Sequence, residues 1–164
     1  PEDRQRMGLV TEFKAHENLI FGYHHQEPYS KSSILQEKEI MSFSKKVMEE
    51  YDVRPRSPNL MTSNFSGGNQ QKIILSRELN ENPKVLLIGQ PTRGVDIGAI
   101  EFIHQRLIDM RDKGAAILLV SVELEEVLSL SDRIVVMFDG NIVGEKVNKD
   151  VTDRDLGLLM AGVA

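Results

Sequence analysis

The spacing of apolar side chains divides this sequence into two parts at about residue 65. In the first part, apolar side chains recur every three or four positions between Gln36 and Tyr51, which is typical of an amphipathic helix with one buried face. A short helix is also expected over residues 15–21, and the glycine- and serine-containing stretch 22–33 is typical of a surface loop. The first part is therefore predicted to be a helical unit.

After residue 65, fully apolar runs alternate with segments of helical spacing. Residues 85–88 and 116–120 are such runs, and we expect both to be strands of a sheet that is covered on both faces. Helices are predicted over residues 66–80, 99–113 and 123–130. This alternation predicts an α/β fold with a parallel sheet and a ligand crevice at the carboxyl ends of its strands.

The last thirty residues predict a hairpin and a final helix. Residues 134–138 and 141–147 flank an Asp-Gly pair at 139–140, which is a strong signal for a two-residue turn. We expect this hairpin at the edge of the parallel sheet. Thr152, followed three positions later by Asp155, predicts a capped helix after the hairpin.

Composition and charge exclude several classes of function. The chain has 164 residues, enough for about one domain. Its formal net charge of −5 argues against a general nucleic-acid partner, which needs a basic surface. It has no cysteine, which excludes a disulfide scaffold, a cysteine-ligated zinc site and thiol catalysis. The longest apolar run, residues 115–120, is far shorter than the ~20 residues of a membrane span.

The candidate chemistry begins where the helix over 66–80 starts. Two glycines, Gly67 and Gly68, follow the capping residue Ser66, so this helix end presents free backbone N–H groups that attract anions. An ordinary loop-to-helix junction would explain these three residues equally well. The longer string over residues 64–72, Asn-Phe-Ser-Gly-Gly-Asn-Gln-Gln-Lys, resembles the signature motif of ABC-type ATPases. More narrowly, it resembles the variant found in bacterial sugar and nucleoside importers.

Two further segments resemble the same family, but they depart from it at the positions that matter for hydrolysis. In the family, the strand matching residues 85–88 is followed by an Asp that helps to hold Mg²⁺ and a Glu that polarises the attacking water. Gly89 and Gln90 occupy these positions here, and Val122 replaces the switch histidine. A glycine, an amide and an aliphatic side chain cannot perform these roles. The resemblance therefore implies a degenerate nucleotide site with no catalytic or metal-binding residue intact.

The resemblance implies an incomplete P-loop NTPase core. No Gly-x-x-x-x-Gly-Lys-Ser/Thr phosphate loop occurs in the sequence, and the first residue is Pro1 instead of Met. We interpret the chain as the C-terminal portion of the second ATPase half of a tandem polypeptide. Residues 1–65 would form the Q-loop neighbourhood, with Glu2 near the Q-loop position, and the helical lobe. Residues 66–164 would form the α/β core.

In this family each ATP, with Mg²⁺, lies between the phosphate loop of one half and the signature of the other. The resemblance therefore implies that this chain does not bind ATP alone but contributes its signature to the site of the first ATPase half. Asp96, in the D-loop, would face that half across the dimer. The positions that would contact or complete the ATP site are Ser66, Gly67, Gly68, Asn69, Gln70 and Asp96.

The same resemblance implies a place and partners for the parent protein. It would be a peripheral protein on the cytoplasmic side of the membrane that powers import of a nucleoside or simple sugar. The helical lobe would dock on the membrane permease, and the chain alone would be inactive as an ATPase. We also expect exposed sheet edge in a truncated core, which would favour a homodimer of the chain or strand exchange.

Two other classes of function stay open at this point. One is a non-catalytic ABC-like module used for dimerisation or regulation, which Gly89 and Val122 fit equally well. The intact Ser-Gly-Gly favours the importer, because a purely structural module has no need of it. The other class, soluble ABC relatives that act on ribosomes or DNA, is disfavoured by the acidic balance.

Overall fold

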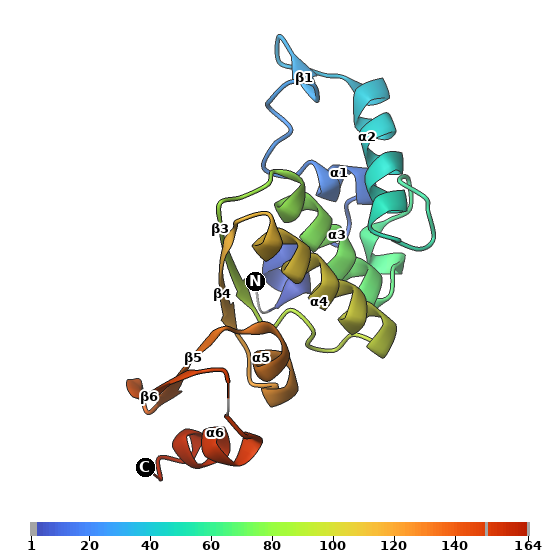
Figure 1. Cartoon of the computed structure of the whole chain (residues 1–164). Coiled ribbons are helices and arrows are strands. Elements are labelled where there is room, and N and C mark those ends of the chain that lie inside the picture. The colour runs from blue at the N-terminus through green and yellow to red at the C-terminus, as the bar shows by residue number, and fades with distance from the viewer. Residues whose placement is uncertain (1–2, 150, 164) are drawn as a thin grey trace.

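The computed structural model describes residues 3–149 and 151–163, and Figure 1 shows an elongated molecule. Helices α1 and α2 lie at one end, α3, α4 and the strand pair β3–β4 in the middle, and β5, β6 and α6 at the other end. The helices are η1 (Arg4–Gly8), α1 (Ala15–Leu19), α2 (Glu37–Glu50), η2 (Thr62–Asn64), α3 (Gly67–Asn80), α4 (Ile97–Asp112), α5 (Leu124–Leu130) and α6 (Asp153–Met160). The strands are β1 (Ser30–Lys31), β2 (Ile34–Leu35), β3 (Val85–Gly89), β4 (Ala116–Val120), β5 (Arg133–Phe138) and β6 (Asn141–Val147).

The predicted helices are confirmed, and their ends follow from local chemistry. Helix α2 buries one face through Ile40, Ser44, Val47 and Met48. Helices α3, α4 and α6 each begin after a residue whose side chain accepts a hydrogen bond from a first-turn N–H, which satisfies one of the free donors there. At α6 the reciprocal bond is also present, so the predicted capping box forms.

One hydrophobic core joins the two parts that we predicted as separate units. It combines Leu19 and Met48 from α1 and α2 with Ile73 from α3 and Ile103 and Leu107 from α4. Helix α3 packs on α1 and on α4, so the helix predicted to carry the signature lies at the centre of the molecule. The division at residue 65 remains a prediction, but the two parts share this core.

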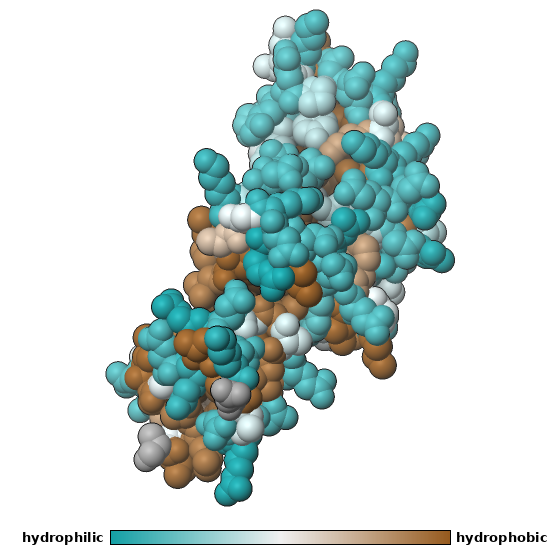
Figure 2. Space-filling model, in the orientation of Figure 1, coloured by the Kyte–Doolittle hydropathy of each residue, from teal (hydrophilic) through white to brown (hydrophobic). Residues whose placement is uncertain are grey.

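The strands β3 and β4 pair in parallel, from Val85 with Ala116 to Gly89 with Val120. We expected both faces of this sheet to be covered, and for the described residues this is wrong. Alternate side chains point to opposite faces. Leu86 is buried against the core, whereas Leu87 and Leu118 are 73% and 60% exposed on the other face. Figure 2 shows hydrophobic surface over this strand pair, whereas the end formed by α1 and α2 is mainly hydrophilic.

The C-terminal hairpin forms as predicted, but not where we expected it. Asp139 and Gly140 both have positive φ, 46° and 73°, as a type I′ turn requires. Strands β5 and β6 form a sheet of their own and, among the described residues, do not extend the β3–β4 sheet. The hairpin buries Ile134 and Val136 against Leu156 of α6 instead, with α5 side chains around them. The predicted loop over residues 22–33 also differs, because its end forms the small β1–β2 hairpin.

Candidate functional site

The first turn of α3 presents an exposed serine. Ser66 is the N-cap of this helix, and its side chain is exposed to solvent. Its Oγ accepts hydrogen bonds from Asn69 at 3.4 Å (backbone N) and 2.9 Å (Nδ2). Among the described residues, no acceptor receives the Ser66 hydroxyl proton. The chain therefore carries an accessible hydroxyl at the positive end of a 14-residue helix.

The two glycines allow the segment after β3 to approach the first turn of α3. A Cβ on Gly67 would lie 2.5 Å from Nη2 of Arg4 and 3.1 Å from the carbonyl oxygen of Gly94. A Cβ on Gly68 would lie 2.8 Å from the Asp96 carboxylate and 3.0 Å from Ala99 Cβ. A side chain at Gly68 would therefore crowd Asp96 and Ala99 of the neighbouring segment, and one at Gly67 would displace the Arg4 guanidinium.

Gln70 lies inside the protein. Its side chain is 2% exposed, Nε2 donates to the Thr62 carbonyl at 3.1 Å, and Oε1 accepts from Gln5 at 3.0 Å. The Gln70 amide thus links the start of α3 to Gln5 in η1 and to Thr62 in the segment just before α3. The predicted contact between Gln70 and ATP stays a prediction, and in this structure its side chain is already engaged.

Asp96 is exposed and belongs to the turn that packs on the signature. Its Oδ1 accepts a hydrogen bond from Ala99 N at 3.0 Å, which caps α4, and its carboxylate lies beside Gly68. The predicted contact of Asp96 with another ATPase half remains a prediction. The structure places this residue next to the signature, on the accessible side of the same turn.

The carboxyl ends of β3 and β4 come together as predicted. Gln90, with φ 49°, donates its N–H to the Val120 carbonyl at 2.8 Å. Its Oε1 lies 3.5 Å from Val122 N, so the two positions that depart from the family pattern are neighbours. Val122 is 63% exposed, and Gly89 has open space where a side chain would be. This strand end therefore has an amide and apolar groups at the positions where the family pattern has a carboxylate and an imidazole, and its lack of hydrolysis remains a prediction.

The donor set fits an anion better than a metal ion. At the signature, the available groups are the Ser66 hydroxyl and the first backbone N–H groups of α3, which donate to phosphate oxygens. At the strand end, the side chains of Gln90 and Val122 provide no carboxylate for Mg²⁺. Among the described residues, no three His, Cys, Asp or Glu side chains are grouped to hold a metal. Glu2, the predicted Q-loop position, lies outside the described residues.

Sequence reasoning missed Arg4. Its guanidinium donates to the carbonyl oxygens of Arg93 and Gly94 at 2.7 Å and 3.1 Å, which ties η1 to the turn before Asp96. About ninety residues separate these partners in sequence. No local sequence pattern predicts this contact. The only hint is glycine at positions 67 and 94, which both lie beside the Arg4 guanidinium.

A second missed group anchors the signature helix on its other side. Lys72 is 11% exposed, donates to the Asp52 carbonyl at 3.0 Å and lies 4.7 Å from the centre of the Phe102 ring. The Asp52 carboxylate also pairs with Arg54, whose hydrogen bond is the main cause that lowers the pKa of this carboxyl. Lys72 therefore serves to hold the helix and is not free for a ligand.

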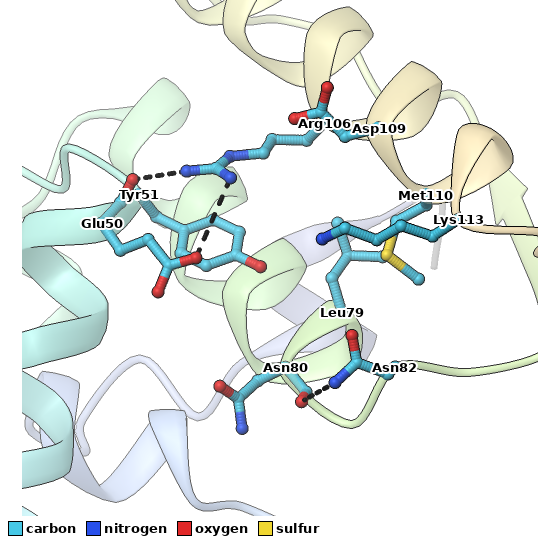
Figure 3. Close-up of a pocket in the computed structure, with 9 residues that line it drawn as sticks. All are labelled: Glu50, Tyr51, Leu79, Asn80, Asn82, Arg106, Asp109, Met110 and Lys113. Atoms are coloured by element: carbon cyan, nitrogen blue, oxygen red, sulfur yellow. Dashed lines mark hydrogen bonds and ion pairs between the residues drawn. The ribbon is translucent and has the colours of Figure 1, made fainter.

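A pocket of about 220 Å³ lies at the far end of α3, between α2, α3 and α4 (Figure 3). Arg106 closes one side, with a hydrogen bond of 2.6 Å to the Glu50 carbonyl and its guanidinium 4.6 Å from the Tyr51 ring. Burial raises the pKa of Tyr51. The pocket is smaller than typical ligand sites of about 300–1,000 Å³. The length of α3, roughly 20 Å at 1.5 Å per residue, separates it from Ser66. We assign no nucleotide to it.

Curated relatives match nearly the whole chain. The guanosine import ATP-binding protein NupO of Bacillus subtilis is 46% identical over 162 residues, which are 99% of this chain and 32% of that protein. The nucleoside import ATP-binding protein NupA of Lactococcus lactis is 48% identical with the same coverage. A ribose import ATP-binding protein of Streptococcus agalactiae is 35% identical over 161 residues. The chain spans about a third of the length of these relatives.

Solved structures show the same fold. The ATP-binding cassette MJ0796 with bound ADP and phosphate matches with a TM-score of 0.69 and 24% identity, over 90% of this chain and 62% of that one. A nucleotide-free cassette from an ABC transporter matches with a TM-score of 0.69 and 26% identity, over 86% and 58%. Over nearly its whole length the chain is homologous to ATP-binding proteins of nucleoside and sugar importers, and it has the fold of ABC ATPase cassettes.

The exposed turn from Ser66 to Asn69 is the segment that we predicted as the signature, and the turn containing Asp96, predicted as the D-loop, packs against it. The roles of both segments remain predictions. No family model matches the chain. None of the helices formed by the described residues combines the length and the apolar character that a membrane crossing requires.

Proposed function

We propose that this chain is part of the ATP-binding subunit of an ABC importer for nucleosides. The relatives with 46–48% identity are named for guanosine and nucleoside import, and those named for ribose or glucose import are 34–35% identical. This order favours nucleosides over simple sugars as the transported class. The subunit would lie on the cytoplasmic side of the membrane, bound to the permease.

Within that subunit, the chain supplies the signature to an ATP site whose phosphate loop belongs to another ATPase half. The single observation that carries this proposal is the exposed Ser66 hydroxyl at the start of α3, with no acceptor among the described residues. Gly67 and Gly68 add no side chain of their own beside the first-turn N–H groups. A triphosphate terminus with only acceptor oxygens matches this set of donors.

The ATP site on this chain's own half would be degenerate. ATP and Mg²⁺ supply the phosphoryl-transfer chemistry when bound, and Gly89, Gln90 and Val122 leave this half without a base or a metal-holding carboxylate. The exposed end of β3 and β4 would therefore bind without hydrolysing. The competent site would be the one that this chain's signature completes.

Docking on the permease would use the helical part of the chain. Phe13 and Phe21 are half-exposed and meet edge to face with ring centres 6.4 Å apart, and Met61 is exposed as well. The Phe13 carbonyl accepts the Thr62 N–H at 2.8 Å, and the Arg77 guanidinium of α3 lies 5.9 Å from the centre of the Phe21 ring, so a shift of α3 would be passed on to both.

Ser66→Ala in the complete importer tests the proposal. A hydrogen bond to a charged group contributes about 1.5–3 kcal/mol. The variant should therefore lose about 10- to 100-fold in ATP hydrolysis, measured as phosphate release with permease present. Unchanged hydrolysis would reject the signature role and leave the non-catalytic dimerisation module as the better function.

A further inference from the structure

The orientation of the Asn69 side-chain amide is fixed by a backbone donor. The Arg54 N–H lies 2.6 Å from Oδ1 of Asn69. A backbone N–H can only donate, so the atom facing it must be the amide oxygen. The amide nitrogen therefore faces the other way, where it lies 2.9 Å from Ser66 Oγ.

This orientation determines what the Ser66 hydroxyl can do. A serine hydroxyl has one proton to donate and two lone pairs to accept. Both contacts from Asn69, through Nδ2 and through the backbone N–H, are donated into Ser66 Oγ. With its acceptor capacity used, the hydroxyl is left with its proton, and Ser66 is exposed to solvent.

We propose that Asn69 is a positioning residue that commits the Ser66 hydroxyl to donate outward, and that it thereby selects an acceptor such as a phosphate oxygen. This inference rests on the proposed function, because the ligand is the terminal phosphate of the ATP bound by the other half. Asn69 contacts Ser66 and Arg54, and its effect on the phosphate passes through Ser66.

The segment before α3 holds this arrangement in place. Asp52, with φ 47°, accepts hydrogen bonds from Lys72 at its carbonyl and from Arg54 at its carboxylate. Two contacts thus hold the segment 52–54 against α3: Lys72 bonds to the Asp52 carbonyl, and Asn69, about one helical turn earlier, bonds to the Arg54 N–H. Because the anchor is a backbone group, the Asn69 amide cannot turn over without losing its bond to Arg54.

A double-mutant cycle on the complete importer separates positioning from a structural role. Asn69→Ala should lower kcat/KM for ATP hydrolysis about three- to tenfold when Ser66 is present. In the Ser66→Ala background, the same change should cost less than twofold, because there is no hydroxyl left to orient. Coupling of this kind is expected between residues in contact.

Asn69→Asp gives a second, near-isosteric variant that keeps the oxygen facing Arg54. Its other carboxylate oxygen would accept the Ser66 proton and turn it away from the ligand, so we expect a larger loss than for Asn69→Ala. Asn80→Ala, at the other end of α3, is the matched control and should leave kcat/KM unchanged. Thermal unfolding of each variant verifies that it folds.

The outcomes are distinct. If Asn69→Ala costs the same with and without Ser66, or if Asn69→Asp is fully active, the positioning role is wrong although the proposed function stands. If Ser66→Ala itself has no effect on hydrolysis, the proposed function fails, and this inference fails with it. A loss that appears only when Ser66 is present supports the proposal.

Discussion

At the scale of single residues, the two signature glycines show how packing and binding demands coincide. A Cβ at Gly68 would meet the Asp96 carboxylate at 2.8 Å and the Cβ of Ala99 at 3.0 Å. Asp96 is held as the cap of α4, and Ala99 is part of that helix, so neither moves away easily. The close approach of these two segments therefore favours glycine at position 68.

This packing makes Gly68→Ala destabilising, against the helical preference for alanine. We expect a loss of about 1–3 kcal/mol in the free energy of unfolding, as for overpacked sites. Gly157 in α6 is the matched control, because a Cβ there has open space. Gly157→Ala should stabilise by about 0.5–1 kcal/mol. Urea unfolding measures the change in the free energy of unfolding for both variants. Changes of the same sign and size would contradict the packing explanation.

Sequence alone predicts some of these residues and not others. The Ser66 cap follows from a local pattern, and the closeness of the strand ends that carry Gln90 and Val122 follows from the predicted parallel sheet. The inward position of Gln70 and the hold of Arg4 on the D-loop do not, because their partners lie far away in sequence. Motif resemblance lists residues, whereas only the packed structure tells which of them face a ligand.

At the scale of elements, helix ends are well predicted because their chemistry is local. The box formed by Thr152 and Asp155 has both of its hydrogen bonds, at 3.2 Å and 2.9 Å. Strand coverage is less well predicted. An apolar run over residues 85–88 predicts a buried strand, but whether both faces are covered depends on what packs there, which the run itself does not specify.

The cap makes a testable contribution to α6. Thr152→Ala should lower the free energy of unfolding by about 1 kcal/mol, because the Asp155 N–H in the first turn loses its partner. Thr11→Ala removes the same hydroxyl at a site where it makes no hydrogen bond among the described residues, so its effect should be small. Chemical unfolding, monitored by circular dichroism, gives the free energy of unfolding of both variants. A loss of equal size for both would show that the cap contributes nothing.

At the scale of the whole molecule, the exposed sheet face dominates the surface. Val85, Leu87, Leu118 and Val120 project from the same side of β3 and β4, and Figure 2 shows the hydrophobic area that results. Apolar patches of this kind drive association in soluble proteins. A homodimer formed through this face would cover it, whereas the expected strand exchange would pair at a sheet edge.

The 164-residue chain should therefore self-associate, with a mass above 18.5 kDa at high concentration. Leu87→Lys combined with Leu118→Glu places opposite charges on paired positions of this face and should shift the chain to a monomer. Ile34→Lys with Leu35→Glu changes an exposed apolar pair on β2 and should not. Sedimentation at several concentrations tests this, and a monomeric unmodified chain would refute it.

The central claim is asymmetry: an intact signature that serves another half, beside a strand end that does not hydrolyse. Its most direct measurement is the steady-state ATP hydrolysis of the complete importer carrying Ser66→Ala, compared with the same importer carrying Val122→Ala. The account predicts a loss of at least tenfold for the first and a change of less than twofold for the second. Equal losses, or a larger loss for Val122→Ala, would contradict it.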